Sequence, residues 1–177
     1  IYKGSIGNRK YTAHWNKLLH IQIDPSGGEY SGEVDFYKDA YETFSLEIPQ
    51  KNGYEFKEWK VSSNDVEING NNVKLGETSI KITAVWSPIS YTITYNLNGG
   101  SGTTKNQYTI EDEFTLIIPT KSGYTFTGWT GSNGTTASKT VTISRGTTGD
   151  KTYTANWQIT NYTITYNLNG GSASNKT

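Results

Sequence analysis

The sequence predicts a mainly β protein, α+β at most, built from small tandem repeats of about 70 residues. Three tryptophans, Trp15, Trp86 and Trp157, lie 71 residues apart, and each ends a similar segment: YTAHW, ITAVW or YTANW. The eleven residues YTITYNLNGGS occur at 91–101 and again at 162–172. Two independent landmarks therefore give the same period, which is typical of small domains in a row rather than of the turns of a solenoid.

Other segments recur with nearly the same spacing. FSLEIP at 44–49 returns as FTLIIP at 114–119, and KNGYEFKEW at 51–59 returns as KSGYTFTGW at 121–129. Both pairs are 70 residues apart. Segments that recur in this way are expected to have the same structural role in each repeat.

The chain therefore divides into two complete repeats and two partial ones. We predict a first repeat at 17–87 and a second at 88–158. Residues 1–16 are expected to be the closing strand of a preceding repeat, and residues 159–177 the opening hairpin of a following repeat. Connections of only a few residues between repeats favour an elongated array.

The opening of each repeat has the pattern of a hairpin. From Tyr91 to Leu97 apolar residues alternate with Thr and Asn, which predicts a half-buried strand. The turn sequence at 98–100, Asn-Gly-Gly, accepts positive φ, so that 107–110 can return as a second strand. The short apolar segment 114–118 predicts either a strand or a single turn of helix.

Two further local features are expected to differ between the repeats. Gly128 before Trp129 predicts a β-bulge that turns the tryptophan inward. Glu58 replaces this glycine in the first repeat, so we expect the bulge to differ there. In the first repeat, apolar residues on both sides of 69–72 predict an extra hairpin.

The recurring aromatic residues are expected to form the cores of the repeats. The chain has no cysteine, so disulfides cannot support domains of this small size. Burial of one Trp of ~200 Å² contributes roughly 5 kcal/mol as an upper estimate. The predicted core residues are Trp15, Tyr54, Phe56, Trp59, Trp86, Tyr91, Ile93, Tyr95, Tyr124, Phe126, Trp129 and Trp157.

Charge and hydropathy exclude several classes of partner. Sixteen basic and sixteen acidic residues cancel, without a block of like charge, so nucleic acid is not an expected partner. No apolar run approaches the ~18 residues of a membrane span, so no membrane insertion is expected. The absence of cysteine also excludes thiol nucleophiles and thiolate metal sites.

Candidate catalytic residues do not form an interpretable pattern. A catalytic residue should break the period, whereas almost every distinctive residue here recurs. His14 aligns with Val and Asn in the other repeats and is interpreted as a surface strand residue, so we expect no metal site from His14 and His20. The acidic segment 111–113 is interpreted as a solvated turn, because Tyr-Glu-Thr occupies these positions in the first repeat. We predict no enzyme activity, no cofactor and no metal site.

The segments 60–78 and 130–150 differ most between the two repeats. Variable loops are where a repeat can carry a specific function. Their oxygen-bearing side chains lack the spacing and the closing Glu of an EF-hand calcium loop. Candidate ligand contacts in these loops are Asn64, Asp65, Asn71, Asn72 and Asn133.

The motifs YxIxYxLNGG, KxGYxFxGW and YxAxW, in this order, resemble the Listeria-Bacteroides repeat, also known as the internalin B-repeat. The resemblance covers nearly the whole chain and implies a bacterial surface or secreted protein with β-grasp repeats, similar to ubiquitin and SUMO. The first repeat departs from the pattern, because it has IQIDPSGG in place of YTITYNLNGG and KEW in place of TGW.

Two functions agree with these observations. In the first, the repeats are an extracellular or cell-wall-associated stalk or spacer, with neighbouring repeats as their partners. In the second, they are an adhesin that binds a host protein or glycan through the variable loops and gains from multivalency. The two partial repeats also predict intermolecular strand complementation between copies of the chain.

Overall fold

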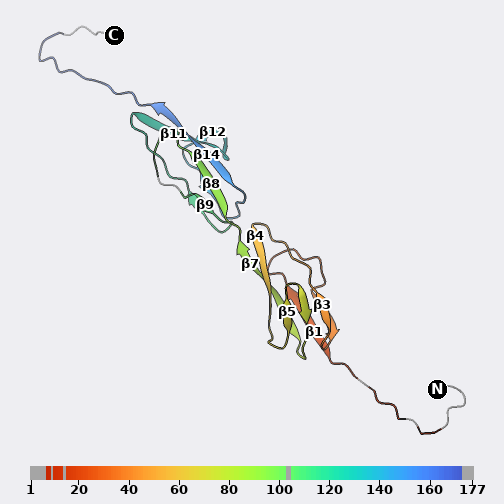
Figure 1. The fold of residues 1–177 in the computed structure, drawn as a ribbon. Coiled ribbons are helices and arrows are strands. Elements are labelled where there is room, and N and C mark those ends of the chain that lie inside the picture. Colours follow the sequence, from red (N-terminus) through yellow and green to blue (C-terminus); the bar gives the residue numbers. More distant parts are fainter. Residues whose placement is uncertain (1–6, 9, 14, 103–104, 173–177) are drawn as a thin grey trace. The chain divides into compact units, whose positions relative to one another are not determined.

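The computed structural model describes residues 7–8, 10–13, 15–102 and 105–172 of the 177. Within these residues the protein contains fourteen β-strands and no helix, which confirms the prediction of a mainly β protein (Figure 1). The chain separates into two compact units, Ile1–Ile89 and Ser90–Thr177, called unit 1 and unit 2 below.

Unit 1 is built on a four-stranded mixed sheet. Its strands are β1 (Leu18–Asp24), β2 (Asp35–Asp39), β4 (Tyr54–Val61) and β7 (Ile80–Pro88), in the order β2-β1-β7-β4. The opening strand β1 and the closing strand β7 run parallel in the centre, whereas the outer strands are antiparallel to their neighbours. The first and last strands of the repeat are therefore paired with each other, so the large sheet forms only when both strands are present.

A second, smaller sheet completes unit 1. Strands β3 (Thr43–Ser45), β6 (Asn72–Lys74) and β5 (Glu67–Asn69) lie in the order β3-β6-β5. The pairing of Asn69 with Asn72 confirms the predicted extra hairpin. The two sheets of unit 1 share one core, because Leu46, Val66 and Val73 belong to the same buried cluster as residues of the large sheet.

Unit 2 repeats the large sheet and adds a strand. Its strands β8 (Tyr91–Asn96), β9 (Gln107–Tyr108), β11 (Tyr124–Gly131), β12 (Gly134–Ser138) and β14 (Lys151–Ile159) have the order β12-β11-β14-β8-β9. The central pair β8 and β14 is again parallel. The extra strand β12 belongs to the divergent segment, which folds back onto β11 here.

The segment 114–118 contains a strand rather than a helical turn. Strand β10 (Phe114–Thr115) pairs with β13 (Thr142–Ile143), and Leu116 beside it is buried. In unit 1 the equivalent strand β3 pairs with β6. The divergent segments therefore supply a partner for this strand in both units, although they reach it by different paths.

A β-bulge is present in both units, where the register shifts between Phe56 and Glu58 in unit 1 and between Phe126 and Gly128 in unit 2. The bulge differs between the units, as expected, because φ is positive at Gly128 and not at Glu58. The cover of the bulge differs as well. At Gly128 φ is 143°, and a Cβ there would lie 2.6 Å from the main-chain nitrogen of Ser138 in β12.

Most predicted core residues are buried or half-buried. Trp59 and Trp129 lie at the centres of their cores, and their indole nitrogens have no hydrogen-bond partner among the described residues. Two others, Ile93 and Phe126, are also buried. The half-buried residues are Tyr54, Phe56, Trp86, Tyr91, Tyr95 and Trp157.

Two predicted core residues are exposed. Trp15 is 91% exposed, whereas Trp86, at the same position of the repeat, packs against Phe56 of β4. Tyr124 begins β11 and is 40% exposed, and its ring lies 4.2 Å from the ammonium group of Lys121. Neither residue contributes to a core in this structure.

The two copies of the eleven-residue segment have different structures. Residues 91–101 form β8 and its turn, whereas 162–172 form no strand, and Tyr162 and Tyr166 are more than 70% exposed. The turn is nevertheless the same. Gly100 N donates to Leu97 O at 2.9 Å, and in the other copy Gly171 N donates to Leu168 O at 2.8 Å.

Candidate functional site

A cluster around the opening turn recurs in both units. The indole nitrogen of Trp86, near the end of β7, donates to the carbonyl oxygen of Pro25 at 3.0 Å. In unit 2, Trp157 donates in the same way to Leu97 O, also at 3.0 Å. These bonds connect the closing strand with the turn that follows the opening strand. Trp86 and Trp157, both predicted core residues, therefore also fix a turn.

The glycine at the end of each turn is required by this tryptophan. A Cβ on Gly28 would lie 2.5 Å from Cζ2 of Trp86, and a Cβ on Gly100 would lie 2.4 Å from Cζ2 of Trp157. Both distances are shorter than a non-bonded contact allows. The Gly-Gly motif is therefore explained by the close approach of the indole ring as well as by the shape of the turn.

A lysine completes the cluster. Lys51 Nζ donates to Ser26 O at 2.9 Å and lies 4.5 Å from the ring centroid of Tyr54 and 5.7 Å from that of Trp86. In unit 2, Lys121 Nζ donates to a turn carbonyl in the same position, at 2.8 Å. Because the arrangement is repeated, we assign it to the stability of each unit, through a cation–π interaction and a charge-assisted hydrogen bond.

Beside this cluster, unit 1 has a groove of about 650 Å³. Aromatic side chains give it an apolar wall, and an ammonium group, a carboxylate and amides surround that wall. Aromatic faces with a few polar groups suit a neutral polar ligand such as a sugar ring. The lining residues are Gly27, Glu29, Ile48, Pro49, Gln50, Lys51, Asn52, Tyr54, Phe56 and Trp86.

Asp65 organises the divergent segment of unit 1. Its carboxylate accepts hydrogen bonds from the hydroxyl groups of Ser63 and Thr78 and from the main-chain nitrogen of Glu77, the last at 2.8 Å. These donors favour the charged form and hold the pKa of Asp65 well below its usual range. The oxygens predicted as ligand contacts are thus used within the loop.

Replacement of Asp65 by asparagine should reduce the acid sensitivity of unit 1. Because the folded pKa is lowered from 3.8, the unfolded chain takes up a proton first as the pH falls. The carboxylate therefore stabilises unit 1 fully above its ordinary pKa, and this contribution is lost as the pH falls toward the folded pKa. The melting temperatures of the unchanged chain and of Asp65→Asn should differ near neutral pH and converge in acid. A constant difference throughout would contradict this role.

Two other predicted ligand contacts, Asn71 and Asn72, also have structural partners. Asn72 Oδ1 accepts from Ser45 Oγ at 2.7 Å, and the main-chain oxygen of Asn71 accepts from Leu46 N at 2.8 Å. Asn64 is exposed in the turn before Asp65.

Asn133, the remaining candidate, belongs to unit 2. Its amide donates to the carbonyl oxygen of Trp129 at 2.9 Å, across the tight turn between β11 and β12. The candidates of unit 1 lie in one loop segment, 64–72, whereas Asn133 closes a separate hairpin. The groove at Lys51 is not predicted above. The recurring KxGY motif, which lies beside a Gly-Gly turn in the structure, is the signal in the sequence that marks its position.

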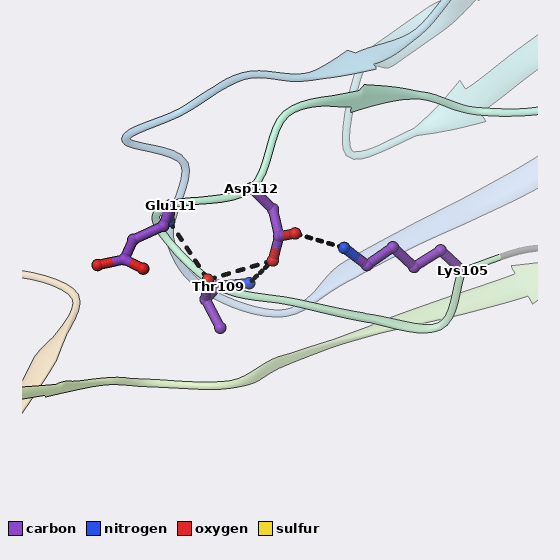
Figure 2. Close-up of polar contacts among 4 residues, drawn as sticks. All are labelled: Lys105, Thr109, Glu111 and Asp112. Carbon is purple, nitrogen blue, oxygen red and sulfur yellow. Dashed lines mark hydrogen bonds and ion pairs between the residues drawn. The ribbon is translucent and has the colours of Figure 1, made fainter.

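The acidic segment 111–113 is a turn held by Asp112, as expected (Figure 2). Asp112 Oδ2 accepts from the main-chain nitrogen of Thr109 at 2.7 Å, and Oδ1 lies 2.5 Å from Lys105 Nζ. These donors lower the pKa of Asp112, with Lys105 as the main cause. Glu42 in unit 1 accepts from Asp39 N in the same manner, at 3.3 Å. The acidic residue at this position therefore caps a turn in both units.

The residues considered for catalysis or metal binding have structural partners where the structure describes them. His20 Nε2 lies 2.6 Å from Asp35 Oδ1 and its ring stacks on Tyr37, whereas His14 lies outside the described residues. No three His, Cys, Asp or Glu side chains of the described residues lie where they could hold a metal ion. Burial raises the pKa of Tyr95 to about 12, so its hydroxyl stays neutral.

Membrane-spanning helices are also absent from the part of the chain that the structure describes.

Comparison with known proteins identifies both units. Residues 91–156 match the Listeria-Bacteroides repeat domain, and residues 20–90 match the divergent InlB B-repeat domain. This is a repeat family of bacterial surface proteins.

Two proteins of Evansella cellulosilytica are similar to the chain. One is described as a putative Gly-rich membrane protein and is 30% identical over 166 residues, which are 90% of this chain and 18% of the relative. The other, described as a putative membrane protein, is 30% identical over 165 residues, which are 90% of this chain and 24% of the relative. The chain thus spans less than a quarter of either relative. No solved structure matches it. Residues 20–156 therefore belong to the family of Listeria-Bacteroides and InlB B-type repeat domains.

Proposed function

We propose that the chain is a non-catalytic segment of a bacterial surface protein and acts there as a stalk or spacer. The observation that carries this proposal is the recurrence of the opening-turn cluster. Trp86 and Trp157 make equivalent hydrogen bonds, each within its own unit. Lys51 and Lys121 likewise donate to equivalent turn carbonyls of their own units. Contacts that recur in both units serve the folding of each unit. A spacer needs no more than folded units in series.

The same proposal includes a β-grasp-like fold and a location outside the cell. The strand order β2-β1-β7-β4, with a parallel central pair, supports a β-grasp sheet without its helix. The extracellular or cell-wall location is supported by the surface-protein family and by relatives described as membrane proteins. Protease treatment of intact cells that produce the parent protein would test this location, because repeats outside the cell are digested.

Small-angle scattering would test the spacer role. A single compact body of 177 residues has a radius of gyration of about 16 Å. For a spacer we expect a clearly larger value, and a maximum dimension that grows by a constant step as one, two and four repeats are joined. A radius near the compact value, or a dimension that stops growing, would contradict a spacer.

The groove in unit 1 favours adhesion as a second function. It combines Trp86 and Tyr54 with the ammonium group of Lys51, and Ile48 at its rim is 62% exposed. Binding of the chain to a panel of matrix proteins and surface glycans would test this function. Ile48→Asp should abolish saturable binding at the groove.

The chain offers a matched control for this experiment. Ile118 occupies the equivalent position in unit 2 and is 61% exposed. Ile118→Asp places the same charge on the surface, and it should leave binding at the unit 1 groove unchanged. A variant with a shortened 60–78 loop distinguishes binding at the groove from binding at the variable loop, because it changes only the loop. Equal loss in both isoleucine variants would contradict recognition by the groove, and absence of binding across the panel would leave the spacer alone.

A further inference from the structure

Five Asn-Gly pairs occur in the chain, and the structure distinguishes between them. They begin at Asn52, Asn69, Asn98, Asn133 and Asn169. In such a pair the main-chain nitrogen of glycine can attack the side-chain Cγ of asparagine, because glycine has no side chain to hinder the approach. A bond forms between this nitrogen and Cγ, the bond from Cγ to Nδ2 breaks, and ammonia leaves with the proton of the main-chain nitrogen. Water then opens the ring to aspartate or isoaspartate.

The two copies of the eleven-residue segment provide a direct comparison. In unit 2, Asn98 Nδ2 donates to the carbonyl oxygen of Ala155 at 2.9 Å, and the carbonyl oxygen of Asn98 accepts from Lys121 at 2.8 Å. The side-chain amide and the main chain of Asn98 are therefore both fixed. Asn169 has the same neighbours in sequence, but its side-chain amide has no partner among the described residues.

The turns of the two divergent segments differ in the same way. Asn133 Nδ2 donates to Trp129 O at 2.9 Å, and Gly134 is held in the ladder opposite Gly131. In unit 1, Asn69 is exposed at the tip of the β5–β6 hairpin, and its amide has no partner within the described part of the chain. Gly70 has a φ of 59°, and nothing lies within 4 Å of a Cβ built on it.

Asn52 is constrained by its turn. Tyr54 N donates to Lys51 O at 3.0 Å across the Asn-Gly pair, and Gly53 O accepts from Ile89 N at 2.9 Å. An equivalent turn bond occurs at Asn169, but Gly53 is buried and its carbonyl is also bonded to Ile89 N, whereas Gly170 is exposed. The pair at Asn52 is therefore grouped with the protected ones.

We propose that Asn69 is a site of spontaneous deamidation in the folded repeat, whereas Asn98, Asn133 and Asn52 are protected by the fold. Asn169, whose copy of the segment forms no strand in this chain, is the unprotected reference. At Asn69 the reaction adds a carboxylate to a chain of formal net charge zero. Isoaspartate also lengthens the main chain by one carbon at a two-residue hairpin turn, beside Asn71 and Asn72. The variable loop of unit 1 therefore changes its charge and shape with age, without any enzyme.

Peptide mapping by mass spectrometry would test this proposal. The full chain is incubated at neutral to mildly alkaline pH, and each Asn-Gly peptide is followed for a mass gain of about 1 Da and for isoaspartate. We expect Asn98 to react at least about fivefold more slowly than Asn169, because a hydrogen bond must break before its amide can react. Asn133 should be slower than Asn69 by a similar factor.

A second incubation in guanidinium chloride supplies the control. There the hydrogen bonds of the fold are absent, so all five pairs should react at similar rates. Equal rates at Asn98 and Asn169 in the folded chain would overturn the proposal. It would also be overturned if Asn69 remained intact in the folded chain while it reacted in denaturant. The variant Asn69→Gln verifies the assignment, because its peptide should lose the mass gain.

Discussion

Truncation of Trp129 to alanine should unfold unit 2 and leave unit 1 folded. The side chain is fully buried, and its ring lies 5.3 Å from that of Phe126 and 5.6 Å from that of Tyr95. Loss of a buried Trp costs about 3–5 kcal/mol. A domain of this size has a total stability of roughly 3–10 kcal/mol. The substitution therefore removes much or all of the stability of unit 2.

Hydrogen exchange followed by mass spectrometry would measure this effect in each unit separately. Amides of β8 and β14 should lose their protection, and amides of β1 and β7 should keep it. Trp129→Phe should restore most of the protection, because the indole nitrogen has no partner among the described residues and only the ring volume is reduced. Trp15→Ala should have little effect, since Trp15 is 91% exposed. Equal loss of protection in both units would contradict the independence of the two cores.

Gly128→Ala is expected to have the second largest effect. A Cβ at this position would lie 2.6 Å from Ser138 N and 2.9 Å from the carbonyl carbon of Ala137. These are main-chain atoms of β12, so the contact is relieved only if β12 moves away from β11. The φ of 143° adds strain for any residue with a side chain. From the contact with β12 and the strain at this φ together, we expect a loss of about 2–4 kcal/mol in the stability of unit 2.

The equivalent substitution in unit 1 is a matched control. Glu58 lies at the same bulge but is exposed, and the small sheet of unit 1 lies elsewhere. Glu58→Ala should change stability by no more than about 0.5 kcal/mol. Denaturant unfolding of each isolated repeat would give both values, after its fold has been checked by circular dichroism. Similar losses in the two repeats would show that the bulge, and not its cover by β12, requires the glycine.

Patterns between near neighbours in the sequence predicted local structure well. The alternation from Tyr91 to Leu97 and the apolar residues around 69–72 predicted a strand and a hairpin that the structure confirms. The predictions at Trp15 and Tyr124 were wrong for a common reason. Each depends on which distant segment lies against the residue, and the repeat pattern does not contain that information.

The candidate site could be predicted only in part. Asn71 and Asn72 were correctly placed near a hairpin turn, but the use of Asp65 as an internal acceptor depends on Thr78, far along the chain. The groove forms because a turn, a proline segment and the closing strand meet, and these are separated by up to 61 residues, as for Pro25 and Trp86. The recurrence of Lys51 and Trp86 marked their importance without showing that a groove lies beside them.

The two copies of YTITYNLNGGS also bear on synthesis of the protein. The turn forms in both copies, so it needs no core, whereas the strand forms only beside β14. During translation each opening strand must therefore wait, unpaired, until its own closing strand emerges, and this delay favours slow folding. Identical opening strands in adjacent repeats can then compete for one closing strand, which is a known cause of misassembly in repeat proteins. Sequence differences between neighbouring repeats, such as IQID in unit 1 against ITYN in unit 2, reduce this competition during cotranslational folding.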